Sequence, residues 1–416
     1  MKINKYWPFV FVYFFVNSVG LPWGLLYTTL LTPFLYYWVV KTRRTEILLP
    51  FMACALPFVI AQVMAGVDMG KYIVSWLNIT GVYIFAQAAY TFLITCKDVE
   101  KQFRRILYLN FALCLIALPF YFTPYYDLFW ISQAFTEGVT NFLRFRLWTY
   151  EASYYCVLFT PVFLFYFYQL MLKQNNGRVW KLVVLLAVPY IISLSIGVIS
   201  CLAITCGLVY IIYFRPLTRK GRMLYLFLSS AVAILAGLVF LLAFFPNNAL
   251  FVRLANIFAG HDQSTSGRIT DAFFLSERIL EFRNPWVGIG PGQLKVLGAD
   301  VIRTYYSYEP DFDIITIPNA TAETLVVFGW IGLVLRLVIQ MGLFLYTKPW
   351  KNYYRLALFL FMFIYQFTGS YVTSTAEYVI WVLAFTNVFP QFDVHLSRFI
   401  KPKSEITPID ARLQNL

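Results

Sequence analysis

Uninterrupted apolar segments recur along nearly the whole chain. Each is about 17 to 25 residues long, the length that an α-helix needs to cross the hydrocarbon core of a bilayer. Backbone polar groups inside a bilayer must find their partners within the protein, which favours helices. We therefore expect an all-α polytopic membrane protein. Its twelve predicted spans lie near residues 6–19, 22–40, 46–64, 72–95, 106–122, 153–171, 182–196, 198–214, 223–245, 321–346, 356–372 and 377–391.

The composition leaves no room for a separate soluble domain. Hydrophobic residues make up 60% of the chain and charged residues only 13%. A soluble domain of ordinary composition contains about twice that share of charge. We expect residues 1–400 to form one transmembrane domain, followed by a cytoplasmic tail at 401–416.

The net charge of +13 reflects topology. Most of the 33 Lys and Arg fall in the short connections that become cytoplasmic when both termini are placed inside. Basic residues are retained on that side of a membrane, so the distribution supports the orientation. Because topology accounts for the basic residues, we expect no nucleic-acid partner. The turn in "ISLSIGVIS", residues 192–200, is equally compatible with a kink in one helix, but the charge distribution favours two spans.

Two predicted outer loops are long, at about 123–152 and 246–320. Long connections between tightly joined elements are more often functional than passive. In the second loop, residues 264–285 predict a helix with apolar positions at helical spacing, followed by "NPWVGIGPG" at 284–292. A nucleotide-binding loop would need a preceding strand, so we interpret this stretch as a turn whose glycines let the backbone fold tightly.

Metal and disulfide sites are not predicted. The "DFD" sequence at 311–313 is best interpreted as a solvated acidic loop, and the chain has only two histidines, His261 and His395. The six cysteines lie in or at the ends of spans without a CxxC pair, as small core residues do. We therefore expect neither a metal nor a cofactor.

Arginines in the outer loops are the main candidates for substrate binding. Arginine presents a planar, permanently charged fork that suits phosphate oxygens. If both loops contribute to one cavity, their arginines form a diphosphate clamp that needs no metal. The candidates are Arg144, Arg146, Arg253, Arg268, Arg278, Arg283 and Arg303.

Two acids stand at predicted outer ends of spans, Glu151 and Glu323. A carboxylate partly sunk into a membrane protein is costly unless paired, and its pKa can rise into the range useful for general acid–base catalysis. Pairing with an arginine for structural reasons is the alternative interpretation for each. Arg336, inside a span, either reaches the interface or pairs with Glu377.

The order and spacing of several motifs resemble the bacterial O-antigen ligase and O-antigen polymerase superfamily over roughly residues 140–335. The matching elements are "RLWTYEAS" with Arg146, Glu151 and Ser153, the serine-rich turn "SLSIGV", "TSGR" ending at Arg268, "NPWVGIGPG", and "NATAETLVVFGWIG" with Asn319, Gly329 and Gly332. Each motif alone is weakly specific, whereas the ordered set is more specific.

Three positions depart from the family pattern. Ala152 replaces a proline, and Ile196 replaces an arginine that is common after the serine of the turn. Ligases of the family carry a histidine immediately before the asparagine, proposed as the base that activates the acceptor hydroxyl, and here the residue is Pro318. The polymerase branch is therefore favoured.

The resemblance implies a multi-span membrane glycosyltransferase of the bacterial inner membrane whose site faces the periplasm. Its substrates would be glycans on undecaprenyl diphosphate, with membrane lipids and a chain-length regulator protein as further partners. The implied catalytic residues are Arg268 and either Glu151 or Glu323 as acceptor base. The implied substrate-binding residues are Arg144, Arg146, Arg278, Arg283 and Asn319.

Three other functions stay open at this stage. A ligase would transfer finished glycan to the lipid A core, but it lacks the histidine at Pro318. A lipid-linked glycan transporter would need a polar path and repeated halves, neither of which the sequence displays. A structural scaffold would leave the outer arginines without a role.

Overall fold

The computed structural model describes residues 7–16, 27–133, 142–172, 179–213, 263–307 and 315–394. Helices account for most of these residues, so the prediction of a helical membrane protein is confirmed at this coarse level. The predicted span 223–245, residues 246–262 of the long loop and the tail 401–416 lie outside the described residues.

Four of the described helices are long and apolar enough to cross a membrane: α4 (Met69–Thr95), α5 (Val99–Phe120), α6 (Ala152–Met171) and α15 (Ala320–Thr347). Shorter apolar helices accompany them, namely α1 (Trp7–Phe11) continued by η1 (Val12–Val16), α3 (Leu48–Met64), α7 (Val179–Ser193), α8 (Ile196–Ile212), α16 (Tyr353–Tyr365) and α17 (Thr375–Phe385). A further helix, α2 (Tyr27–Lys41), packs along α4.

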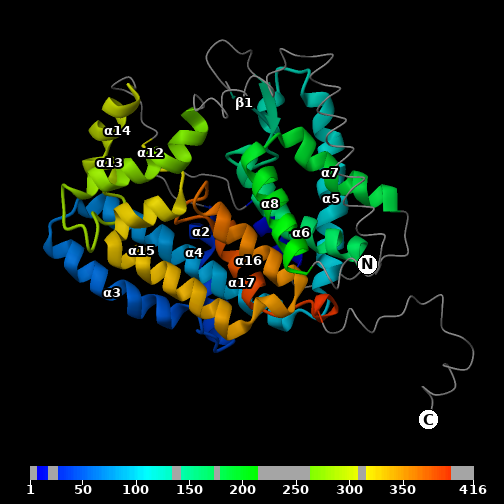
Figure 1. Ribbon diagram of the computed structural model, residues 1–416, viewed down its shortest axis with the longest axis horizontal. Coiled ribbons are helices and arrows are strands. Elements are labelled where there is room, and N and C mark those ends of the chain that lie inside the picture. Colours follow the sequence, from blue (N-terminus) through cyan, green and yellow to red (C-terminus); the bar gives the residue numbers. More distant parts are fainter. Residues whose placement is uncertain are drawn as a thin grey trace, which may run out of the picture.

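The helix ends gather at two ends of the bundle (Figure 1). One end holds the residues just before α4 and α6, the turn between α7 and α8, the segment before α15 and the connection from α16 to α17; we call it the site end. Contacts across it join Arg283 to Gly66, Asp68 to Gln293, Arg144 to Ser193, Arg268 to Glu151 and Asn319 to Phe367. Both predicted outer loops, in their described parts, lie there.

The opposite end collects the other connections. Gln169 near the end of α6 donates to Glu100 at the start of α5, and Tyr213 after α8 donates to the carbonyl of Trp350. Leu194, with a φ of +46°, separates α7 from α8 at the site end. Two separate helices are therefore present here in place of one kinked helix.

A short antiparallel sheet is the exception to the all-helical expectation. Strand β1 (Trp130–Gln133) pairs with β2 (Phe142–Phe145), and Trp130 lies opposite Phe145 with ring centroids 5.4 Å apart. The Trp130 indole also donates to the carbonyl of Ala117 at 2.8 Å, which attaches the hairpin to the end of α5. Aromatic cross-strand pairs of this kind stabilise isolated hairpins, which are otherwise marginal.

Helix α6 occupies the centre of the bundle, where it contacts α5, α7, α8, α16 and α17 (Figure 1). Its aromatic side chains fill the core, among them Tyr155, Phe159 and Phe165, each 1% exposed or less. A helix that is buried around its whole circumference is typical of the interior of a membrane bundle. The first turn of α6 is thereby held at a fixed place at the site end.

In its described part, the long loop forms three helices above α15 (Figure 1): α12 (Gln263–Leu280), α13 (Leu294–Leu297) and α14 (Ala299–Tyr306). The helix predicted within 264–285 is confirmed as α12. Its buried face is formed by Ala272, Leu275 and Ile279, which join a second apolar cluster with Val326 of α15. Ile269 on the same helix is 41% exposed and does not belong to that face.

Helix α15 is broken at Gly329, whose φ and ψ are +67° and −170°. Residues of "NPWVGIGPG" replace the hydrogen bonds that the break removes. The amides of Ile289 and Gly290 donate to the carbonyls of Val326 and Val327, each at 3.0 Å. In the other direction, the amides of residues 330 and 331 donate to the carbonyls of residues 285 and 286, at 2.9 and 3.1 Å.

Glycines make this insertion possible, as the interpretation of the stretch as a structural turn predicted. A Cβ atom at Gly288 would lie 2.5 Å from the backbone of Val327 and of Gly329. A Cβ at Gly329 would lie 2.4 Å from the carbonyl carbon of Trp286. Both residues also have positive φ values, a region that L side chains rarely adopt.

Substituting Gly329 tests the insertion. We expect Gly329→Ala to destabilise the protein by about 3 kcal/mol, since the new methyl group collides with rigid backbone at a positive φ. Gly342→Ala is the matched control in the same helix, because its Cβ would meet nothing within 4 Å. Thermal unfolding of the two detergent-purified variants measures the difference. Equal stability of the variants would contradict the inserted-loop arrangement.

Candidate functional site

A narrow cavity, with about 300 Å³ of empty space when the part open to solvent is included, lies at the site end between α6, α12, the residue before Asn319 and the α16–α17 connection. Glu151, Arg268 and three serines line it. Four tyrosines form much of the remaining wall. The serines and tyrosines are Ser153, Ser370, Ser374, Tyr150, Tyr154, Tyr365 and Tyr371. A concave site with aromatic walls and few charged groups is the usual form of a small-molecule binding site.

Among the described residues, Glu151 and Arg268 are the only charged ones that line this cavity, and their side chains form an ion pair. Nη2 of Arg268 lies 2.9 Å from Oε1 of Glu151, and the two side chains are 28% and 14% exposed. Glu151 stands at the residue before α6, and Arg268 projects from α12, 117 positions later in the chain. The sequence predicted both residues as site candidates, and the structure brings them together.

The charge of Glu151 is fixed by this pairing. Burial acts to raise the pKa of the carboxyl, but the guanidinium of Arg268 and, more weakly, that of Arg144 outweigh it, so the pKa lies below its ordinary value. The expectation that this carboxyl has a raised pKa is therefore wrong for Glu151 in the state described. Conversely, the pKa of Arg268 is raised, because the Glu151 carboxylate outweighs burial.

Asn319 holds Arg268 in place through its backbone. The side-chain amide of Asn319 donates to the carbonyls of Arg268 and Phe367, both at 2.7 Å. Its oxygen accepts from the amides of Thr321 and Ala322 and so caps α15. These four bonds use the whole hydrogen-bonding capacity of an asparagine side chain. The prediction that Asn319 orients a substrate group is therefore replaced by a positioning role.

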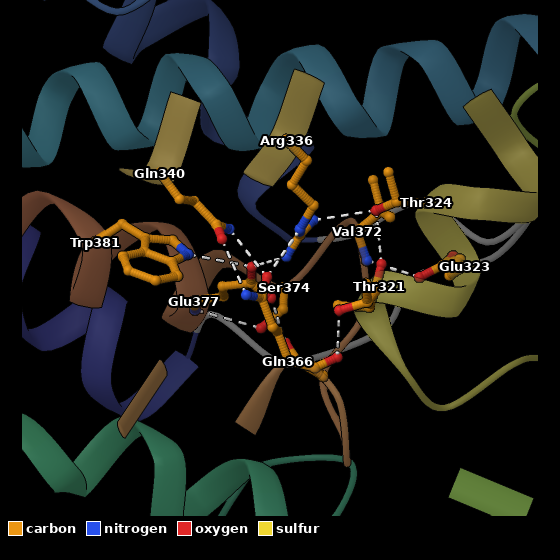
Figure 2. Close-up of polar contacts among 12 residues, drawn as sticks. Thr321, Glu323, Thr324, Arg336, Gln340, Gln366, Val372, Ser374, Glu377 and Trp381 are labelled. Carbon is orange, nitrogen blue, oxygen red and sulfur yellow. Dashed lines mark hydrogen bonds and ion pairs between the residues drawn. The ribbon is translucent and has the colours of Figure 1, made fainter. Parts of the chain in front are cut away.

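Glu323 lies one turn into α15 and supports the cavity wall from behind. Its Oε2 accepts from the amide of Val372 at 2.7 Å (Figure 2). Val372 follows Tyr371, which lines the cavity, whereas Glu323 itself does not. Burial raises the pKa of Tyr371 to about 12, so its hydroxyl stays protonated at neutral pH. Glu323 thus fixes the segment that presents the Tyr371 side chain.

A buried polar network lies behind the same segment (Figure 2). Arg336 of α15 pairs with Glu377 of α17 and donates from Nε to Gln366 at 3.0 Å. Gln340 and Gln366 exchange two hydrogen bonds of 2.9 Å each. Of the two possibilities left open for Arg336, pairing with Glu377 is the one observed. Ionised groups at this depth are stable only when they are paired and hydrogen-bonded, as these are.

The network reaches the cavity through Ser370. Its hydroxyl donates to Oε2 of Glu377 at 2.7 Å, although its backbone has a φ of +67°. A side chain other than glycine persists in such a conformation only where its surroundings hold it. Trp381 also donates to Glu377, at 3.3 Å. The Arg336–Glu377 pair therefore helps to set the path of residues 366–374 around the cavity.

The other predicted arginines lie elsewhere. Arg144 is 5% exposed and donates to the carbonyl of Ser193 at 3.1 Å, behind Glu151. Arg146 and Arg283 donate to the carbonyls of Asp127 and Gly66, at 2.9 and 2.8 Å, and so hold loops. Arg278 is exposed on α12. None of these four lines the cavity, and Arg303 pairs with Asp300 on α14, so Arg268 is the one arginine of the predicted clamp that lines the cavity among the described residues; Arg253 lies outside them.

Sequence reasoning missed most of the uncharged residues of the site. Tyr371 and Ser370 lie in a stretch predicted as span, and Gln340 and Gln366 were not singled out. A usable signal was present, because two glutamines in otherwise apolar segments require buried partners. Pro318, at the position of the ligase histidine, lines the cavity.

No model of a known protein family matches the chain, and a search of curated proteins finds no match. Within the described ranges, no cluster of three or more His, Cys, Asp or Glu side chains is arranged to hold a metal ion.

The Glu151–Arg268 pair predicts a stability difference that depends on pH. Because the pKa of Glu151 in the folded protein is lower than the ordinary value of a glutamate, the pair stabilises fully above that ordinary value, and its contribution is lost as the pH falls through the folded pKa. We expect Glu151→Gln to be less stable than the wild type by about 2 kcal/mol at neutral pH. The difference should shrink in acid. Thermal unfolding at a series of pH values measures it, and a constant difference would count against the ion pair.

Proposed function

We propose that the protein is a polymerase of surface polysaccharides such as O-antigen, which joins glycan repeat units carried on undecaprenyl diphosphate. One observation supports this most directly. Motifs that are far apart in the sequence, "RLWTYEAS", "TSGR" and the segment before Asn319, contribute Glu151, Arg268 and Pro318 to a single cavity. These motifs are the ones on which the resemblance to the O-antigen ligase and polymerase superfamily depends.

The chemistry of the cavity suits a donor with a diphosphate leaving group. Polymerisation forms a bond between a hydroxyl oxygen of the acceptor sugar and the anomeric carbon of the donor. The bond from that carbon to the diphosphate oxygen breaks, and the acceptor proton passes to a base. Negative charge grows on the diphosphate, and a fixed arginine in a partly buried site stabilises that charge without a metal. Arg268 has that position.

Glu151 is the better placed of the two candidate bases. Its carboxylate lines the cavity, whereas Glu323 lies behind the wall and holds the amide of Val372. We therefore assign proton acceptance to Glu151 and a positioning role to Glu323. Arg144 stands close enough to Glu151 to influence its charge, but its hydrogen bond to Ser193 gives it a supporting role.

The proposed topology has twelve spans, both termini in the cytoplasm and the site at the periplasmic face of the bacterial inner membrane. The arrangement of charges supports this orientation, since basic residues are retained on the cytoplasmic side. At the end opposite the site lie the turns that contain Lys41, Arg43, Arg44, Lys97, Lys101, Lys348 and Lys351. A chain-length regulator in the same membrane is the proposed protein partner.

Two alternatives predict different glycan profiles for a deletion strain. Loss of a polymerase leaves lipid-anchored glycan one repeat long. Loss of a ligase leaves unmodified lipid A core together with long glycan on undecaprenyl diphosphate, and loss of a transporter leaves repeat units facing the cytoplasm. Against the ligase alternative, Pro318 lines the cavity at the position of the ligase histidine. Accumulation of long lipid-linked glycan in the deletion strain would refute the proposal.

Substituting Arg268 tests the residue on which the proposal depends. In a deletion strain supplied with Arg268→Ala, we expect polymer formation to fall by at least about 100-fold, because the charge on the leaving group is no longer stabilised. Arg278→Ala is the control on the same helix, since Arg278 is exposed and does not line the cavity. Gel profiles of the glycan, with protein levels measured in parallel, give the result. Wild-type polymer in Arg268→Ala at normal protein level would remove Arg268 from the mechanism.

A further inference from the structure

The cation of the proposed site already has an anionic partner. A guanidinium nitrogen of Arg268 and a carboxylate oxygen of Glu151 lie 2.9 Å apart, a charge-assisted hydrogen bond inside the cavity. A diphosphate offers the same kind of acceptor, a charged oxygen. Substrate and Glu151 would therefore compete for the same donors.

The two partners differ in how firmly they are held. The carbonyl of Arg268 is fixed by the amide of Asn319, and its side chain extends from α12. Glu151 is the residue before α6, where its side chain makes no capping hydrogen bond to the helix backbone and is hydrogen-bonded to the Ser153 side chain as well as to Arg268. The carboxylate can therefore change its partner without breaking a helix cap, whereas a shift of the Arg268 backbone would break the bond to Asn319.

We infer that Glu151 is a resident counter-ion, which the diphosphate of the donor displaces from Arg268, and that the displaced carboxylate then accepts the proton of the acceptor hydroxyl. This inference rests on the proposed function. In this inference, binding of the correct leaving group releases the base from Arg268. The Glu151 carboxylate would thus stay paired with Arg268 until a lipid diphosphate is bound.

The surroundings of Glu151 make the released carboxylate more basic. Arg268 on α12 is the largest influence that lowers its pKa, ahead of Ser153 on α6 and Arg144 on β2. Once the diphosphate neutralises Arg268, burial is opposed mainly by those two weaker groups. The facing phenol groups of Tyr150, from the segment before α6, and Tyr371, from the α16–α17 connection, are uncharged, since both pKa values are raised.

The reaction then balances within the site. The acceptor hydroxyl oxygen bonds to the anomeric carbon, and that carbon separates from the diphosphate oxygen with its electron pair. The hydroxyl proton passes to Glu151, and the diphosphate charge stays with Arg268. When undecaprenyl diphosphate leaves, Arg268 regains Glu151, whose carboxyl releases the proton to solvent.

Binding of a sugar-free probe shows whether Glu151 competes with the diphosphate for Arg268 or holds Arg268 in place for binding. The experiment titrates undecaprenyl diphosphate into the purified full-length protein in lipid nanodiscs. If Glu151 competes with the probe, Glu151→Gln should bind it about tenfold more tightly than the wild type, because the donors of Arg268 are free. The same variant should form polymer at least about 100-fold more slowly than the wild type, because the base is lost. Lipid-linked repeat units extracted from the deletion strain serve as the substrate for that assay.

Three variants complete the design. Glu277→Gln should bind the probe as the wild type does, since Glu277 is exposed on α12 and does not line the cavity. Arg268→Ala should abolish the gain from Glu151→Gln in the double variant. Glu151→Asp retains the charge with a shorter reach, so it should bind with intermediate affinity, and it replaces Glu151→Gln if that variant does not fold.

The outcomes distinguish the inference from the proposed function. Unchanged or weaker binding by Glu151→Gln or by Glu151→Asp would mean that Glu151 supports Arg268, and would overturn the exchange while leaving a lipid-diphosphate site in place. Tighter binding with undiminished turnover would overturn the assignment of Glu151 as base. Failure of the wild type and every variant to bind the probe would instead overturn the proposed function, and the inference with it.

Discussion

Backbone hydrogen bonding inside a bilayer is the constraint on which the architecture depends. Each unsatisfied amide or carbonyl in hydrocarbon costs several kcal/mol, so a break in a membrane helix persists only where other groups replace the lost bonds. At Gly329, residues 285–290 of the long loop supply those bonds, and Gln62 of α3 donates to the carbonyls of Val287 and Val327. The loop is thereby fixed to the helix that carries Asn319 and Glu323.

Two ion pairs of opposite character lie along this framework. Arg336 and Glu377 are enclosed by polar side chains, with Glu377 only 1% exposed, and their bonds are shared with Gln366 and Ser370. Glu151 and Arg268 line a cavity, and their side chains are more exposed than those of the first pair. Since a buried pair is costly to separate, the first suits a structural support and the second suits a pair that exchanges.

The parts of this structure that the sequence predicted are those with a local physical cause. Apolar length identified the helices, helical spacing identified α12, and the glycines of "NPWVGIGPG" indicated a tight turn. The β-hairpin, the break at Gly329 and the grouping of Gln340 with Gln366 depend on contacts between distant segments. For the same reason the position of Arg268 was predictable only as one of several outer arginines, since its selection depends on where α12 docks.

The hydrogen bonds of Asn319 connect three elements of the fold. One side-chain amide ties the carbonyl of Arg268 on α12 to that of Phe367 beyond α16, while the same side chain begins α15. These hydrogen bonds therefore hold three elements together on one side of the cavity. The facing wall, at the start of α6, is joined to it here by the exchangeable Glu151–Arg268 bond. A ligand that took the place of Glu151 on Arg268 would therefore break the bond between these two sides of the cavity while leaving the bonds of Asn319 intact.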